Sequence, residues 1–156
     1  MISQDINKKI AEALKARDEI RLSTLRMLSS AFNYEKIAVQ RDLTEEDELK
    51  VIRREAKKRI DAIESLREAR GKTTSSDSTT LDKRLKQEES ELEILREFLP
   101  AEMADEELQK LVDEAVKEIG ASEMKDMGRV IGVVMKKADG KVDGRKVAEM
   151  VKSKLT

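Results

Sequence analysis

The chain of 156 residues contains no cysteine, no histidine and no tryptophan, and only one proline, one tyrosine and two phenylalanines. Without cysteine or histidine there is no disulfide framework, no zinc or haem site with sulfur or nitrogen ligands, and no Cys/His or Ser/His nucleophile pair. We therefore predict no catalytic residue, no metal site and no cofactor. The scarcity of aromatic residues also means that the core must be built from aliphatic side chains.

Long hydrophobic runs are absent too. No stretch approaches the roughly 18 apolar residues of a membrane span, and the first five residues are neither a secretory nor an Arg-rich transit signal. We expect a cytoplasmic protein with no membrane partner. Charged residues, in contrast, make up 42% of the chain, with 32 basic and 33 acidic groups. This balance gives no global argument for nucleic acid, and we expect no recognition of a DNA sequence.

Apolar residues recur with a helical period along the whole chain, which predicts an all-α protein. In the first hundred residues we expect four helices, whose apolar stripes run over 6–14, 22–32, 49–66 and 81–99. Thr44 and Asp47 have the spacing of a capping box at the start of the third helix. The ten residues 71–80 are rich in serine and threonine and have no apolar anchor, so we expect a mobile loop there.

The single proline marks the expected domain boundary, because the residue before a proline avoids the helical conformation. Residues 1–100 would form the N-terminal helical domain and residues 101–156 a compact three-helix bundle. The expected helices of the bundle cover about 105–119, 123–137 and 143–155. Gly120 is placed to end the first of them and Asp143 to cap the last.

Two charged residues interrupt the apolar stripes of the long helices. Arg59 falls between Ile52 and Ile63 on the third helix, and Glu88 falls among the leucines of the fourth. An unpaired charge would be expensive to bury. We predict an ion pair between Arg59 and Glu88, with Glu35 as the substitute acceptor. The alternative is that both side chains reach out to water at the edge of the stripe.

Three kinds of binding site are suggested by parts of the sequence, but each lacks residues that it requires. The tripeptide 71–73 ends like a phosphate-binding loop but has Leu66 in place of the required glycine. Residues 139–144 resemble part of a calcium loop, yet Lys141 and Met150 stand where carboxylates are needed. Phe32, Tyr34 and Phe98 all fall on or near apolar stripes, which leaves no platform for stacking single-stranded bases.

The C-terminal third is strongly polarised in charge. Residues 101–123 carry two lysines against eight acidic residues, a net charge of −6, and residues 124–156 carry nine basic residues against four acidic ones, a net charge of +5. On the helix expected over 123–137, Lys125, Arg129 and Lys136 lie within roughly 40° of each other. They lie opposite the apolar stripe that contains Val130 and Val134.

Two glycines share this basic face. Gly128 and Gly132 point away from the apolar stripe, although each costs about 1 kcal/mol of helix propensity relative to alanine. Bare backbone there would let a bulky anionic partner approach closely, and the competing interpretation is a plain solvated cationic face. The hypothesis requires that no carboxylate neutralises the surface. The candidate RNA-binding residues are Lys125, Gly128, Arg129, Gly132, Lys136, Lys137, Gly140, Lys141, Arg145 and Lys146.

Four segments of the chain resemble the YqeY (GatB/YqeY) family: 24–31, 57–61, 88–100, and 126–137 with the following Gly140-Lys141. This family is the stand-alone counterpart of a tail domain found in the glutamyl/aspartyl-tRNA amidotransferase. The resemblance implies an all-helical fold with a small C-terminal bundle that binds tRNA. Gly132, Met135, Lys136, Gly140 and Lys141 match the tail's Gly-x-x-Met-Lys and Gly-Lys pattern.

One departure from the family concerns a helix start. Ala104 stands where the family has a serine or threonine cap, so Asp105 is expected to cap instead.

The residues and the resemblance together predict a non-catalytic module that binds tRNA or another structured RNA. It would act beside tRNA-dependent amidation, the route that forms Gln-tRNA and Asn-tRNA, with an amidotransferase or aminoacyl-tRNA synthetase component as a possible neighbour. One alternative is a protein-interaction module or accessory subunit. Another is a carbon-nitrogen ligase in its own right, for which no nucleophile and base can be nominated.

Overall fold

The computed structural model describes residues 1–74, 78–138 and 141–156. Over these ranges the chain forms seven α-helices and one short 3-10 helix, with no strand, which confirms the all-α prediction. Two compact units are present, Met1–Leu99 and Pro100–Thr156. Within the described ranges, no helix has the length and hydropathy needed to cross a membrane.

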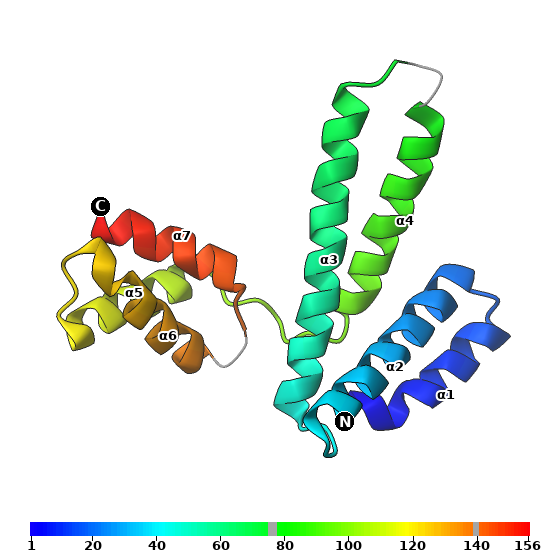
Figure 1. Ribbon diagram of the computed structural model, residues 1–156, viewed down its shortest axis with the longest axis horizontal. Helices are drawn as coiled ribbons and strands as arrows, with labels where there is room; N and C mark the ends of the chain where they lie inside the picture. Colours follow the sequence, from blue (N-terminus) through cyan, green and yellow to red (C-terminus); the bar gives the residue numbers. More distant parts are fainter. Residues whose placement is uncertain (75–77, 139–140) are drawn as a thin grey trace. The chain divides into compact units, whose positions relative to one another are not determined.

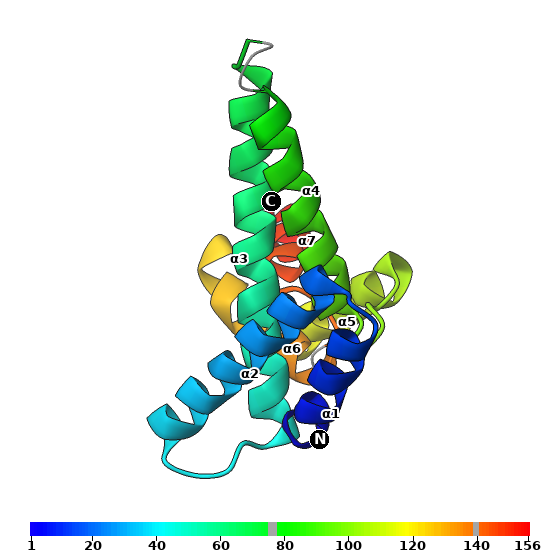
Figure 2. The same ribbon diagram turned by 90° about the vertical axis from the view of Figure 1, so that its right-hand side faces the viewer.

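The first unit consists of two helical hairpins (Figures 1 and 2). Its helices are α1 (Ile2–Lys15), α2 (Glu19–Val39), α3 (Glu45–Gly71) and α4 (Ser78–Arg96). The α1–α2 hairpin packs near the end of the α3–α4 hairpin where α3 begins and α4 ends. The shared core is mostly aliphatic: Phe32 is buried in it, Phe98 packs against it, and its fully buried members include Leu28, Ile52 and Leu95.

Capping groups fix where α1 and α3 begin. Thr44 and Asp47 form the expected capping box: the Thr44 hydroxyl accepts the Asp47 N–H at 3.2 Å, and the Asp47 carboxylate accepts the Thr44 N–H at 2.9 Å. The start of α1 is capped from another helix. Glu48 of α3 is fully buried, and its carboxylate accepts the N–H groups of Ile2 at 2.8 Å and Ser3 at 3.1 Å, together with the Ser3 hydroxyl.

Both ends of the loop expected over 71–80 are helical in the structure. Helix α3 continues to Gly71, and α4 already includes Ser78, Thr79 and Thr80. Serine and threonine are acceptable at the start of a helix, where their hydroxyl oxygens can accept hydrogen bonds from the free backbone N–H groups. Residues 75–77, at the centre of this expected mobile loop, lie outside the described residues. At its other end α4 stops at Arg96, three residues earlier than expected.

Arg59 joins α3 to α4 through a cluster of carboxylates. Its Nε donates to Glu91 Oε2 at 2.7 Å, and the same nitrogen lies 3.6 Å from Glu88 Oε2. Glu55, one turn earlier on α3, lies 3.7 Å from Arg59 Nη1. Glu88 is therefore within ion-pair distance, but Glu91 accepts the hydrogen bond. The expected substitute acceptor, Glu35, instead pairs with Arg54 at 3.0 Å.

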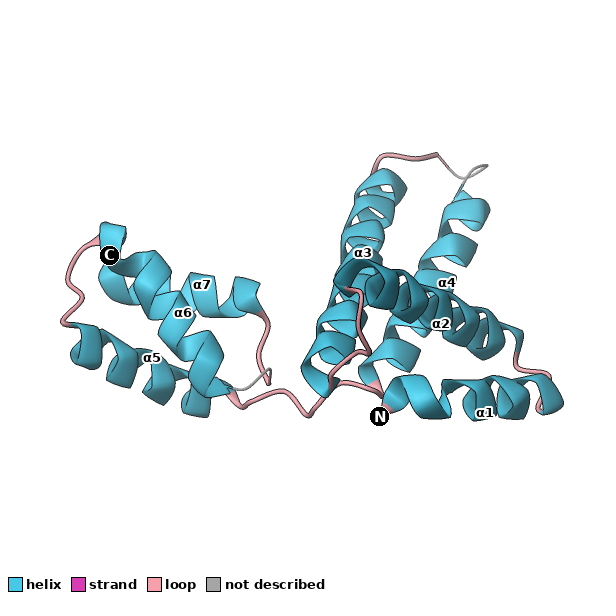
Figure 3. Cartoon of the chain, turned by 60° about the horizontal axis from the view of Figure 1, so that its bottom comes forward, coloured by secondary structure: helices cyan, strands magenta, loops and turns pink. Residues whose placement is uncertain are grey.

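The second unit is a bundle of α5 (Asp105–Ile119), η1 (Met124–Asp126), α6 (Met127–Ala138) and α7 (Gly144–Leu155). Figure 3 shows α5, α6 and α7. Its separate core contains Leu108 and Val112 of α5, Val130 and Val134 of α6, and Val147 of α7, all fully buried.

Gly120 ends α5 in the left-handed conformation at φ 70°, as predicted. The carboxylate of Asp143 accepts the N–H of Arg145 at 3.1 Å and so caps α7, also as predicted. The expectation for Asp105 is wrong. Ala104 occupies the N-cap position of α5 without a side-chain hydrogen bond, and Asp105 is the first helical residue.

Candidate nucleic-acid interface

Helix α6 separates an apolar face from a polar one. Val130, Val134 and Ala138 are buried. Because each residue advances the helix by about 100°, Arg129 and Lys136 fall on the opposite side, and both are exposed. The packing of α6 between α5 and α7 therefore fixes which of its side chains face the solvent.

Gly128 and Gly132 lie on this exposed side. A Cβ atom added to either glycine would meet no atom of another segment within 4 Å. Neither glycine is thus needed for close helix packing inside the unit, which is the usual reason for glycines four residues apart. The backbone of α6 is open to a partner at both positions.

Lys125 does not share this face in the way the helical projection predicts. It belongs to the 3-10 turn η1, and α6 begins only at Met127. The turn forms because Asp126 accepts the N–H groups of Ser122 at 3.3 Å and Glu123 at 3.4 Å. A projection at 100° per residue does not hold across such a turn. The Lys125 ammonium pairs with Glu123 at 3.1 Å.

Carboxylates of α5 engage two further lysines. Lys137 Nζ lies 2.7 Å from Glu118 Oε2, and Lys146 Nζ contacts the carboxylate of Asp105. The pKa of each lysine is raised, first by the hydrogen bond to its carboxylate. The expectation of an uncompensated surface is therefore wrong for Lys125, Lys137 and Lys146. The sequence could not show this for Lys137 and Lys146, because their pairs join different helices.

Three of the remaining candidates lie outside these pairs. None of the ion pairs within the described ranges involves Arg129, Lys136 or Lys141. The backbone of Lys141 is held in place: its N–H donates to Ala138 at 3.0 Å, and its carbonyl accepts the Met103 N–H at 2.8 Å. Arg145 is exposed in the first turn of α7. Gly140 lies outside the described residues.

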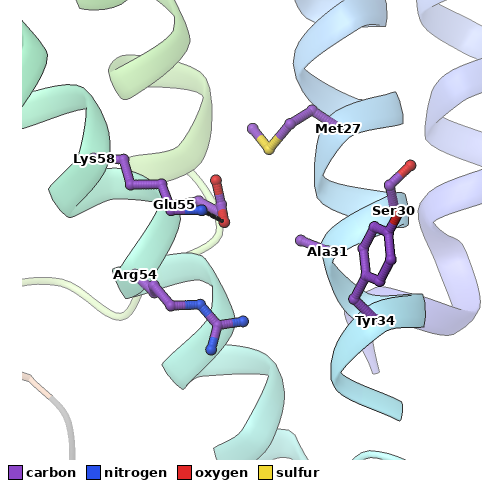
Figure 4. A pocket seen from close by; sticks show the side chains of 7 residues that line it. All are labelled: Met27, Ser30, Ala31, Tyr34, Arg54, Glu55 and Lys58. Carbon is purple, nitrogen blue, oxygen red and sulfur yellow. Dashed lines mark hydrogen bonds and ion pairs between the residues drawn. The ribbon is translucent and has the colours of Figure 1, made fainter. Parts of the chain in front are cut away.

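A separate hollow of about 580 Å³ opens between α2 and α3 in the first unit. Figure 4 shows its two walls, with Met27 and Tyr34 on α2 facing Arg54 and Lys58 on α3. The other lining residues are Ser30, Ala31 and Glu55. Tyr34, at the wall of the hollow, is 75% exposed, and Ile37, three residues further along α2, is 72% exposed.

The expectation that Tyr34 lies on or near an apolar stripe is wrong. Residues two apart on a helix point about 200° away from each other, so Tyr34 cannot share the buried face of Phe32. The exposed ring is a feature that the sequence could have revealed. Its position beside a hollow could not be foreseen, because the hollow depends on how α2 and α3 diverge.

The fold and the exposed face define an all-helical, two-unit chain with a cationic, glycine-bearing helix in its second unit. Residues 3–155 match the family model described as Yqey-like protein, and the chain belongs to this family. A relative of similar sequence is an uncharacterized protein of Schizosaccharomyces pombe, C22F3.15. It is 35% identical over 95 residues, which cover 61% of this chain and 69% of the relative.

Proposed function

We propose that the second unit is a non-catalytic module that binds the backbone of structured RNA, with tRNA as the first candidate, and that it acts beside tRNA-dependent amidation. One observation carries the proposal. Arg129 and Lys136 are exposed, without an ion pair among the described residues, on the side of α6 where Gly128 and Gly132 leave the backbone bare.

The chemistry of this face suits phosphate groups rather than bases. Arginine and lysine neutralise phosphates and release the counterions condensed on them, which makes binding salt-dependent. Such contacts position a protein on nucleic acid but do not read sequence. With four to six contacts, the slope of log K against log salt should be about −3 to −5.

The decisive experiment reverses the charges on the face. The triple variant R129E/K136E/K141E should lose more than about 100-fold in affinity for unfractionated tRNA in a filter-binding titration. The matched control is K8E/K15E/K83E, which changes the net charge equally at exposed lysines of the first unit. We expect the control to lose less than about threefold. Equal loss in both variants, or unchanged affinity in the first, would contradict the proposal.

Under this proposal the chain itself does not catalyse amidation. The sequence provides neither histidine nor cysteine for a nucleophile and base, so amidation would be carried out by a separate enzyme. Release of glutamate from glutamine, dependent on ATP and charged tRNA, by the purified chain alone would show that this assignment is wrong.

The hollow in the first unit supports a second candidate function, docking of a protein helix. The cations at the hollow are more exposed than the carboxylates that they pair with. The side chain of Arg54 is 51% exposed and that of its partner Glu35 is 25% exposed. The side chain of Lys58 is 58% exposed and that of its partner Glu55 is 6% exposed. A partner would therefore meet exposed positive charge across the hollow from Tyr34, with the exposed Ile37 three residues further along α2. This chemistry fits an amphipathic helix that carries acidic residues beside its apolar side chains.

A photo-crosslinking amino acid at Ile37 tests the second function, with the same group at the exposed Lys86 of α4 as control. We expect crosslinks from position 37 alone, to a peptide with apolar and acidic residues at helical spacing. Crosslinks to RNA or to a second copy of the chain would contradict this assignment. The variant Y34S/I37S should keep its affinity for tRNA, because it leaves the second unit unchanged.

A further inference from the structure

Two lysines at the edges of the proposed RNA-binding face already form ion pairs within the unit. Lys137 near the end of α6 and Lys146 near the start of α7 each contact a carboxylate of α5. The two carboxylates come from opposite ends of α5: Asp105 is its first residue, and Glu118 is its last but one. Helix α5 thus holds cations on both neighbouring helices.

A carboxylate and a phosphate offer a lysine ammonium the same kind of contact, because each presents negatively charged oxygens that accept hydrogen bonds. A phosphate that contacts Lys137 or Lys146 must displace the carboxylate or share the ammonium with it. Displacement is feasible because both pairs are open to water. The side chains of Lys137 and Glu118 are 38% and 60% exposed, and those of Lys146 and Asp105 are 40% and 70% exposed. Exposed pairs of this kind are weak.

We propose that Asp105 and Glu118 are internal competitors of RNA, so that α5 weakens binding at the face formed by α6 and α7. This inference rests on the proposed function. Arg129, Lys136 and Lys141 make the first contacts with the phosphates. Lys137 and Lys146 are added only when the RNA replaces the carboxylates of α5. The affinity for RNA is thus set by the carboxylates of α5 as well as by the basic residues of α6 and α7.

The competition has a specific effect on salt dependence. Each lysine that leaves a carboxylate exposes an anion that takes up a cation from solution, which offsets the counterion released from the RNA. Removing both carboxylates should therefore make the slope of log K against log salt steeper by about 1.5. At low salt the affinity should rise about three- to tenfold, since each exposed pair contributes little by itself.

The test compares two double variants with the same change in net charge. D105N/E118Q removes the competing carboxylates. E106Q/E107Q removes two exposed acidic residues of the same helix, for which the structure shows no ion pair within the described ranges. Both are titrated with unfractionated tRNA over a series of salt concentrations. We expect the steeper slope and tighter binding for D105N/E118Q alone. An equal gain in both variants would reduce the effect to net charge and overturn the inference, as would no gain.

A measurement without RNA separates this inference from the proposed function. In NMR titrations of the full chain, the pKa of the Lys137 and Lys146 ammonium groups should fall in D105N/E118Q and stay in place in E106Q/E107Q. Lysine pKa values that do not move would overturn the competition even if tRNA binds. If the pKa values move but neither the wild type nor a variant binds tRNA, the proposed function fails instead.

A reciprocal variant guards against misfolding of D105N/E118Q. Because Lys137 and Lys146 are partly neutralised within the unit, K137Q/K146Q should lower affinity less than R129Q/K136Q does. Equal losses from the two variants would mean that the pairs with α5 have no effect on binding, which would also overturn the inference.

Discussion

At the scale of single residues, one buried carboxylate of the first unit caps a helix that lies far away in the sequence. Glu48 is fully buried although it is charged, and it is tolerated because its oxygens accept two backbone N–H groups and a hydroxyl at the start of α1. A helix leaves its first N–H groups without internal partners. Here the missing cap comes from a residue 45 positions or more along the chain.

Replacing Glu48 with glutamine should destabilise the chain. The amide keeps the volume, but it loses the charge and presents N–H hydrogens to N–H donors, so we expect a loss of about 1 to 3 kcal/mol in the free energy of unfolding. Urea denaturation measures it. The control is Glu46→Gln, which removes an exposed carboxylate paired with Lys50 and should change stability by less than about 0.5 kcal/mol. Similar losses in the two variants would argue against the capping role.

The distances around Arg59 predict which of two carboxylates couples to it more strongly. The hydrogen bond of the Arg59 Nε goes to Glu91 at 2.7 Å, and Glu88 lies at 3.6 Å. In double-mutant cycles with Arg59→Met, the coupling to Glu91→Gln should be about 1 to 3 kcal/mol and the coupling to Glu88→Gln smaller. Urea denaturation of the single and double variants gives both values. A larger coupling to Glu88 would mean that the guanidinium prefers that residue in solution.

At the scale of helices, the N-terminal caps of α3 and α7 and the C-terminal cap of α5 could be predicted, because each depends on neighbours in the sequence. Thr44 with Asp47, Gly120, and Asp143 act within one turn. The start of α6 could not be predicted, because the choice between a 3-10 turn and an α-helix over 124–126 differs by few hydrogen bonds. The cap of α1 by Glu48 depends on tertiary packing, which a helical period does not encode.

In the candidate site, too, some features could be predicted from the sequence and others could not. The exposure of Gly128, Gly132, Arg129 and Lys136 follows from the period of α6 and could be predicted. The neutralisation of Lys137 and Lys146 could not, because it depends on which helix packs beside them. A count of charges along the chain shows acidic and basic segments but not the pairs between them.

The capping box of α3 predicts acid sensitivity. The pKa of Asp47 lies well below its ordinary value, first because Arg41 donates to it at 2.6 Å and then because the Thr44 N–H and hydroxyl do so. A carboxylate with a depressed pKa in the folded state stabilises the fold above its unfolded pKa and loses this contribution as the pH falls. The difference in urea midpoint between the wild type and Asp47→Asn should therefore shrink below about pH 5. A constant difference from about pH 7 down to about pH 2.5 would contradict this.

The glycines of α6 predict an unusual combination of effects. Gly128→Ala and Gly132→Ala should each stabilise the unit by about 0.5 to 1 kcal/mol, because alanine favours a helix and its methyl group meets no other segment. Under the proposed function the same variants should bind tRNA more weakly, since the methyl groups block the bare backbone. Gly120→Ala is the contrasting case and should destabilise α5, because its φ of 70° disfavours a side chain. Thermal unfolding and tRNA titration measure the two effects.

At the scale of the whole molecule, the chain has two hydrophobic cores with no shared member among the described residues. One is built by α1 to α4 and the other by α5 to α7, and the boundary between the two units falls at the Leu99–Pro100 junction. The two proposed surfaces lie in different units, the RNA-binding face on α6 and the hollow between α2 and α3. Each could therefore change without loss of the other.

Separate cores predict separate loss of stability, which hydrogen exchange can follow in each unit. Leu95→Ala should remove about 2 to 5 kcal/mol from the first unit, because Leu95 is fully buried there. Its backbone amides should exchange faster, while those around Val134 keep their protection. Leu108→Ala, at a fully buried position of the second core, should show the reverse. If either substitution lowered protection in both units equally, the cores would unfold together. A partner docked on one unit could then change the stability of the other.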